Sequence, residues 1–242
     1  MKITFDGKEF SLPLHWHEVT LSQILESDKL LKDMPEKLYE ETFEGKEVEY
    51  TEDEKIDNWK FYREWVGFWV KIPKSYELKI EDLTWLYQSL IFLMGSAKEE
   101  DVIIQDTFTF KGVEYGLPEA EKLLNGQTKE MANSTYAEFI ECAQLTTKIN
   151  QLKSGDITAL PMLTAILYRP IVETGYWFWK KRKVSDYKEK EVQLRMEEFK
   201  QLPMDKVWSA YFFLTEHLKA YLNGLQTSLK EKVKELDTVG IC

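Results

Sequence analysis

The sequence predicts an α+β fold that is predominantly helical, built as a tandem duplication of one unit and ending in a long C-terminal helix. Three observations support this prediction. Two eleven-residue segments nearly repeat each other, a segment with helix-capping spacing follows each of them, and apolar residues recur at helical spacing over much of the remaining chain.

The repeated segments are ITFDGKEFSLP at 3–13 and FTFKGVEYGLP at 108–118. In each, alternating apolar residues flank a dipeptide that ends in glycine, Asp6-Gly7 or Lys111-Gly112. Such a dipeptide supplies the positive φ angles of a type I′ turn, so each segment is predicted to be a β-hairpin. A proline then ends each second strand, because proline cannot donate to a ladder.

The order of predicted helices is also shared between the two halves. VTLSQILE at 19–26 and STYAEFIE at 134–141 both have the spacing of a capping box. Each half then has an aromatic-rich helix that ends in proline, and after it a helix opened by an aspartate, Asp82 or Asp205. This order favours divergent duplication, with a first unit over 1–101 and a second over 102–242.

Several segments have no counterpart in the other half. TFEGKEVEY at 42–50 repeats the letters of the hairpin turn, so the sequence allows two or three short hairpins in all. The acidic stretch around it, 40–57, is expected to be a solvated loop. The second half carries an inserted aromatic and basic segment at about 174–200. Its last helix is predicted to run from Met204 to about Leu236.

Composition limits the function classes. Hydrophobic residues make up 43% of the 242, enough for a substantial core, and the net charge of −10 argues against general binding of nucleic acid. The only cysteines, Cys142 and Cys242, are not expected to pair. The longest uncharged apolar run, at 83–95, is too short to cross a bilayer, so a soluble protein made in the cytoplasm is expected.

No catalytic signature is present. The sequence has no nucleophile elbow, no phosphate-binding loop and no dinucleotide fingerprint. His15 and His17 have the spacing of paired metal ligands, but zinc needs three or four ligands, so a polar loop is the favoured interpretation. The protein is therefore expected not to be an enzyme and to hold neither a metal nor a cofactor.

One aromatic and basic cluster stands out near the start of the inserted segment. Aromatic rings beside cations suit a membrane interface or single-stranded nucleic acid, while a helix that buries its rings and lets the cations reach water is the favoured alternative. The candidate patch residues are Tyr176, Trp177, Trp179, Lys180, Lys181, Arg182 and Lys183.

The end of the last predicted helix carries a narrow apolar stripe close to a heptad seam. Such a stripe needs a partner helix, from this chain, from a second copy, or from a different protein. The candidate interface residues are Leu218, Leu222, Leu225, Leu229, Val233 and Leu236.

FTFKGVEYGLP, STYAEFIE and ALPMLTAILYRP (159–170) together resemble bacteriophage structural-module proteins, namely tail-assembly chaperones and small virion proteins. This resemblance implies non-enzymatic work through contacts with other virion or assembly proteins, or with further copies of the chain. It also implies a location in the host cytoplasm during assembly or within the virion. The alternatives are a bacterial adaptor with a membrane-interface patch and, third, an enzyme without a recognisable motif.

Overall fold

The two predicted hairpins form, and they share one register. In this computed structural model, which describes residues 1–95, 97–118, 157–175 and 181–216, every residue pair of the first hairpin recurs in the second 105 positions later, so that Lys2–Ser11 corresponds to Thr107–Gly116. The additional hydrogen bond at the base of each hairpin is conserved too, from Leu12 N to Met1 O and from Leu117 N to Asp106 O, both 2.8 Å. The strands are β1 (Lys2–Phe5), β2 (Lys8–Ser11), β3 (Thr107–Phe110) and β4 (Val113–Gly116).

Both turns have the backbone that the sequence predicts. Asp6 and Gly7 have φ angles of 46° and 75°, and Lys111 and Gly112 have 48° and 79°. Two successive positive φ angles define a type I′ turn, which matches the twist of the flanking strands.

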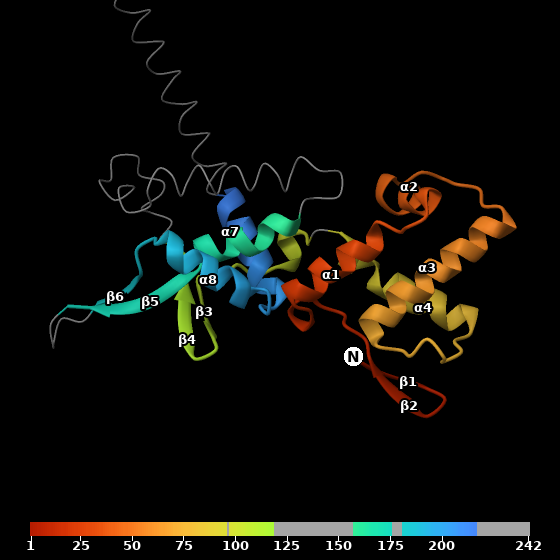
Figure 1. The fold of residues 1–242 in the computed structure, drawn as a ribbon, viewed down its shortest axis with the longest axis horizontal. Coiled ribbons are helices and arrows are strands. Elements are labelled where there is room, and N and C mark those ends of the chain that lie inside the picture. Colours follow the sequence, from red (N-terminus) through yellow and green to blue (C-terminus); the bar gives the residue numbers. More distant parts are fainter. Residues whose placement is uncertain (96, 119–156, 176–180, 217–242) are drawn as a thin grey trace, which may run out of the picture. The chain divides into compact units, whose positions relative to one another are not determined.

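The chain divides into two compact units, Met1–Lys98 and Glu99–Cys242, three residues from the boundary expected from the sequence. In the first unit, helices surround a core that includes Leu12, Leu21, Leu38, Trp65 and Leu86, each at most 1% exposed. Figure 1 shows these helices in red-orange to yellow, with the hairpin of β1 and β2 extending from them. The helices are α1 (Leu21–Leu31), α2 (Glu36–Glu44), α3 (Glu52–Val70) and α4 (Ile80–Leu90), with 3₁₀ turns at Trp16–Glu18 and Ile91–Met94.

Local sequence explains where the helices of the first unit begin. Thr20 caps α1 and Thr51 caps α3, each accepting from the amide three residues on, and the capping box of Thr20 with Gln23 is confirmed. The helix expected at Asp82 begins earlier, at Ile80, so Asp82 lies inside its first turn instead of capping it. There the carboxylate still meets the positive end of the helix dipole.

The second unit builds a larger sheet on its hairpin, in the order β3-β4-β5-β6. Gly116 of β4 allows this packing, because a Cβ at that position would lie 3.1 Å from Val184 Cγ2 and 3.2 Å from Ile171 Cδ1. The first hairpin has Ser11 at the equivalent position, and its two-stranded sheet includes no further described strand. The remaining elements are 3₁₀ turns at Glu99–Asp101 and Ile157–Ala159, α7 (Leu160–Leu167), β5 (Arg169–Thr174), β6 (Lys181–Val184), α8 (Glu189–Phe199) and a helical segment over 204–216.

A partly buried polar cluster joins separate parts of the second unit. The hydroxyl of Tyr168 donates to Ser209 Oγ or to Gln105 O, each 3.1 Å away, and the amide of Gln105 donates to Ser209 Oγ over 2.8 Å. Burial raises the pKa of the Tyr168 hydroxyl, so it stays protonated and able to donate. The lead-in to β3, the residue after α7 and the 204–216 segment are thereby fixed to one another.

The third hairpin that the sequence allows does not form, and the prediction of a loop over 40–57 is wrong for most of that stretch. Residues 42–44 end α2, and Gly45, with a φ angle of 66°, terminates that helix in the left-handed conformation. The rings of Tyr39 and Phe43, four residues apart, contact each other with centroids 4.7 Å apart, which favours helix over strand pairing. Much of the acidic stretch at 40–57 is accordingly helical, and only 45–51 is irregular.

Duplication of the whole unit stays a prediction. The hairpins correspond residue by residue, but α7 leads almost directly into β5, whereas α3 is followed by a loop and another helix. The second capped helix, at 134–141, lies outside the described residues, as does the C-terminal helix beyond Glu216.

Candidate functional site

The structure describes only part of the predicted patch and none of the predicted seam. Tyr176, Trp177, Trp179 and Lys180 lie outside the described residues, and so do Leu218, Leu222, Leu225, Leu229, Val233 and Leu236. The sequence favours a helix for this patch. That prediction is wrong for its described part, because Lys181, Arg182 and Lys183 lie on strand β6. They pair there with Thr174, Glu173 and Val172 of β5.

Acidic neighbours compensate two of the three described patch cations. Arg182 reaches across β5 to an ion pair with Glu114 of β4, and Lys183 Nζ lies 3.6 Å from an Asp186 carboxylate oxygen. A phosphate or lipid headgroup would have to compete with these carboxylates for the cations. The described part of the patch therefore gives weaker support to a membrane or nucleic-acid surface than its sequence suggests.

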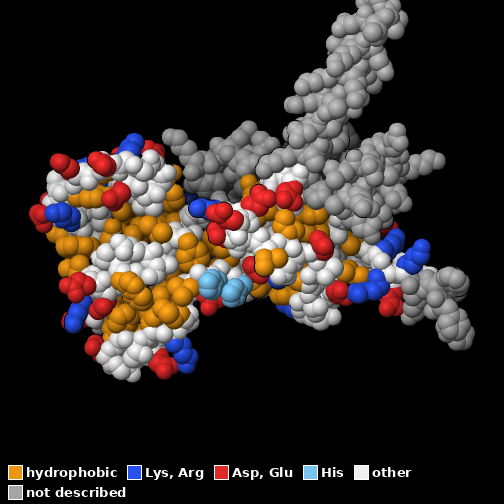
Figure 2. Space-filling model, turned by 180° about the vertical axis from the view of Figure 1, so that it is seen from behind, with side chains coloured by type: hydrophobic (Ala, Val, Ile, Leu, Met, Phe, Trp, Pro, Cys, Tyr) orange, Lys and Arg blue, Asp and Glu red, His pale blue; other side chains and the backbone are white. Residues whose placement is uncertain are grey.

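His15 and His17 lie side by side at the surface, with ring centroids 5.4 Å apart and planes within 12° of parallel. Figure 2 shows them as the pale blue side chains. Glu18 turns to the backbone instead, accepting from the amides of Leu14 at 2.6 Å and His15 at 3.1 Å. Within the described residues no group of three His, Cys, Asp or Glu side chains is arranged to hold a metal ion.

Glu18 should stabilise the first unit only when ionised. The backbone hydrogen bond from Leu14 lowers the pKa of its carboxyl below the ordinary 4.5, so its contribution is present above that value and is lost as the pH falls through the folded-state pKa. We expect Glu18→Gln to lower the free energy of unfolding by about 1 kcal/mol at pH 7. The difference should shrink towards zero in acid.

Denaturant titrations at a series of pH values measure this effect. Glu77→Gln is the matched control, because Glu77 is exposed. An equal loss of stability for Glu18→Gln at every pH would contradict the role given to the carboxylate.

A candidate site among the described residues is an open groove of about 800 Å³ along one side of α3 in the first unit. The residues that line it are mostly apolar. Two of these residues are well exposed, Ile56 at 44% and Trp59 at 36%. Figure 2 shows hydrophobic side chains gathered on the visible face of this unit, with charged side chains around them. The apolar lining consists of Leu30, Ile56, Trp59, Gly67, Phe68, Ile72 and Leu83.

Large side chains lie on two faces of α3, one that packs into the core and one that lines the groove. Trp65 and Trp69 point into the core and are at most 4% exposed. Ile56, Arg63 and Gly67 line the groove with Trp59, at the three- and four-residue steps that keep side chains on one helix face. Sequence reasoning missed the groove, because its residues have the same types and spacing as the core residues.

Arg63 fixes one end of the groove. Its guanidinium donates to the carbonyl of Pro73 at 2.6 Å and to that of Tyr76 at 2.9 Å, and so holds the loop between α3 and α4 against the helix. Lys71 begins that loop with a φ angle of 60°, which ends α3. The positions of Ile72 and Lys74 in the groove wall follow from this loop.

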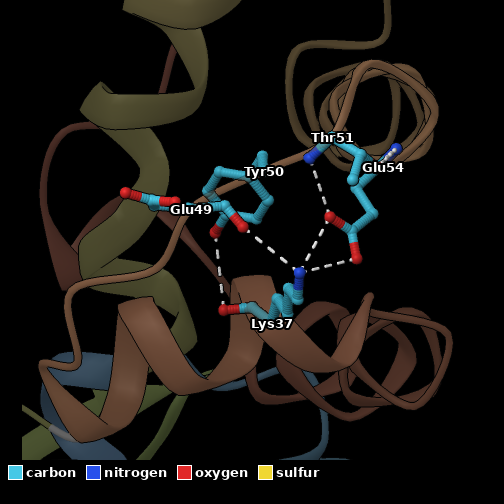
Figure 3. A network of polar contacts seen from close by, with 5 residues as sticks. All are labelled: Lys37, Glu49, Tyr50, Thr51 and Glu54. Atoms are coloured by element: carbon cyan, nitrogen blue, oxygen red, sulfur yellow. Dashed lines mark hydrogen bonds and ion pairs between the residues drawn. The ribbon is translucent and has the colours of Figure 1, made fainter.

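A polar network fixes the other end of α3 (Figure 3). Lys37 of α2 donates to the carbonyl of Glu49 at 3.2 Å and to the carboxylate of Glu54 at 2.9 Å, while Glu54 also accepts from the amide of Thr51. The Lys37 contact lowers the pKa of the Glu54 carboxyl, and burial raises the pKa of the Tyr50 hydroxyl. The first turn of α3, just before Ile56, is thereby tied to α2.

Comparison with protein-family models, curated proteins and solved structures finds no match for this chain. Within the described ranges, no helix has the length and apolar character needed to span a bilayer. The groove is therefore interpreted from its own chemistry.

Proposed function

We propose that this chain is a non-enzymatic bacteriophage assembly or virion protein, and that the α3 groove of its first unit binds a partner protein. The observation that supports binding is a mostly apolar hollow whose walls include a tryptophan and an isoleucine left well exposed. Exposing such side chains to water costs about 25 cal/mol for each Å² of apolar surface, so a partner that covers them gains free energy. The phage class itself rests on the resemblance carried by the segments at 108–118, 134–141 and 159–170.

A protein partner fits this groove better than a small molecule. Its volume lies within the range of ligand pockets, but such pockets cover most of the ligand surface. Here Ile56 and Trp59 remain open to solvent along one side. A segment of another protein would cover these side chains with its own surface and leave its remaining face to other contacts.

The proposal predicts a complex with a virion protein that depends on Trp59. We expect the full chain, coexpressed with the products of neighbouring genes, to copurify with a portal, capsid or tail protein. Trp59→Asp should abolish the complex by placing a charge in the groove wall. Trp85→Asp, on α4 and 45% exposed, is the matched control and should leave the complex intact.

Two results would overturn this proposal. Absence of any such complex would remove the assembly function, and equal binding by the two aspartate variants would remove the groove from it. Circular dichroism spectra of both variants keep loss of binding separate from loss of fold.

A further inference from the structure

Gly67 lies in the interior of α3, and nothing in the described structure requires a glycine there. Its φ angle is not among the positive ones. A Cβ added to it would lie 3.6 Å from Ile72 O and 3.7 Å from Arg63 Nη1, which are ordinary contact distances. Glycine in a helix interior destabilises a protein relative to alanine. The cost is explained if an occupant of the groove must approach the helix backbone closely at this point.

Positive charge collects around the groove, although the unit as a whole is acidic. Residues 1–98 contain 13 Lys and Arg against 20 Asp and Glu, whereas the groove lining contains Lys60, Arg63 and Lys74 against one acid, Glu64. The two partners of Arg63 are neutral carbonyl groups, so its charge is not compensated by them. Lys74 and Glu64 are 3.9 Å apart with side chains 92% and 56% exposed, a weak pair.

The third cation of the groove, Lys60, has an acidic neighbour that compensates part of its charge. This neighbour limits the positive electrostatic field at the groove. Lys60 Nζ lies 2.8 Å from a carboxylate oxygen of Asp57, one turn back on α3, at the surface. Just beyond the lining, Lys71 adds a further cation, with its Nζ 4.6 Å from the centre of the Phe68 ring. An apolar wall strengthens the field of such charges, because it excludes water.

From these two observations we infer that the groove binds an acidic amphipathic peptide segment of the partner. An aromatic or aliphatic anchor of that segment lies over Gly67, and flanking Asp or Glu side chains face Lys60, Arg63 and Lys74. This inference rests on the proposed protein-binding function and names the chemistry of the partner. The buried anchor gives affinity, and the carboxylates give the orientation and the rate of association.

A display library of random short peptides tests the inference on the full chain. We select on the wild-type protein and remove peptides that also bind Gly67→Leu, which puts a large side chain at this point of the groove lining. The expected peptides combine an aromatic or aliphatic residue with Asp or Glu. Enrichment of Lys- or Arg-bearing peptides, or of none, would overturn the inference.

Gly67→Ala is the most informative variant, because it should raise the stability of the protein and lower its affinity for the peptide. The temperature of unfolding should rise, since alanine is the better helix former, while affinity for the selected peptide should fall about threefold. Gly67→Leu should lower the affinity at least tenfold. Fluorescence anisotropy with the labelled peptide measures both. Unchanged affinity in Gly67→Ala and Gly67→Leu would show that no anchor lies over this residue.

Charge reversal tests the acidic flanks. Lys60→Glu combined with Lys74→Glu should lower affinity about tenfold at low ionic strength and reduce its dependence on salt. Lys2→Glu combined with Lys8→Glu makes the same change of charge on the exposed hairpin and should have little effect. Equal losses in the two double variants would indicate a response to net charge alone. A virion partner that needs Trp59 but shows no preference for acidic peptides would refute this inference and leave the proposed function standing.

Discussion

Replacing Trp65 by alanine should destabilise the first unit by about 3–5 kcal/mol, a large part of the stability of a domain this size. Trp65 is fully buried and packs between Phe61 and Trp69, with ring centroids 6.2 and 5.9 Å away. Its indole Nε1 makes no hydrogen bond to the described residues, so its contribution comes from packing. Trp65→Phe should therefore cost much less than Trp65→Ala.

Hydrogen exchange read by mass spectrometry measures this loss within the first unit. Peptides from α3 and α4 should lose protection in Trp65→Ala, and denaturant unfolding gives the size of the change. Trp85→Ala removes the same side chain from a site that is 45% exposed, and it should change stability by less than about 0.5 kcal/mol. Similar losses in the two variants would mean that burial does not set the contribution of these tryptophans.

The hairpins were predictable because the decisive chemistry is local. The dipeptides Asp6-Gly7 and Lys111-Gly112 favour one turn type, and alternating apolar residues beside them supply the two strands. The fragment at 42–50 shares the letters of that turn, yet Gly45 there ends a helix. A glycine with a positive φ angle can form a hairpin turn or end a helix. The spacing of apolar residues on either side of the glycine has to distinguish the two.

The basic strand could not be predicted from its own residues. Consecutive cations favour neither helix nor strand, and Lys181–Val184 becomes β6 because it pairs with β5, a strand rich in β-branched residues. That pairing also places Arg182 near Glu114, which is 68 residues away in the chain. Such a charge pair depends on the fold and is invisible in a sequence pattern.

The groove was hidden for a related reason. Trp59 and Trp65 are both apolar residues at helical spacing, and only the tertiary packing decides that Trp65 is buried and Trp59 is 36% exposed. Gly67 was the one available signal, since a glycine inside a strongly helical segment calls for an explanation. The glycine indicates a groove only when the positions of α1, α4 and the loop after α3 are known, because these elements supply the rest of the lining.

Replacing Phe199 by alanine should destabilise the second unit by about 3–5 kcal/mol. Phe199 is fully buried at the end of α8, where its ring meets Tyr115 edge-on at 5.0 Å and lies 6.4 Å from Phe108 and 6.1 Å from Phe110. A two-stranded hairpin has little stability alone in water. The hairpin of β3 and β4 therefore depends on this contact as well as on its pairing with β5.

The expected loss should appear first as faster hydrogen exchange in residues 107–116. Leu194→Ala, on the same helix but 73% exposed, supplies the control, and its exchange should match that of the wild type. If Phe199→Ala left the hairpin protected, β5 alone would be enough to hold it. Because β1 and β2 have no equivalent of β5 in the described chain, the same comparison would show whether the two hairpins, alike in register, are stabilised by different partners.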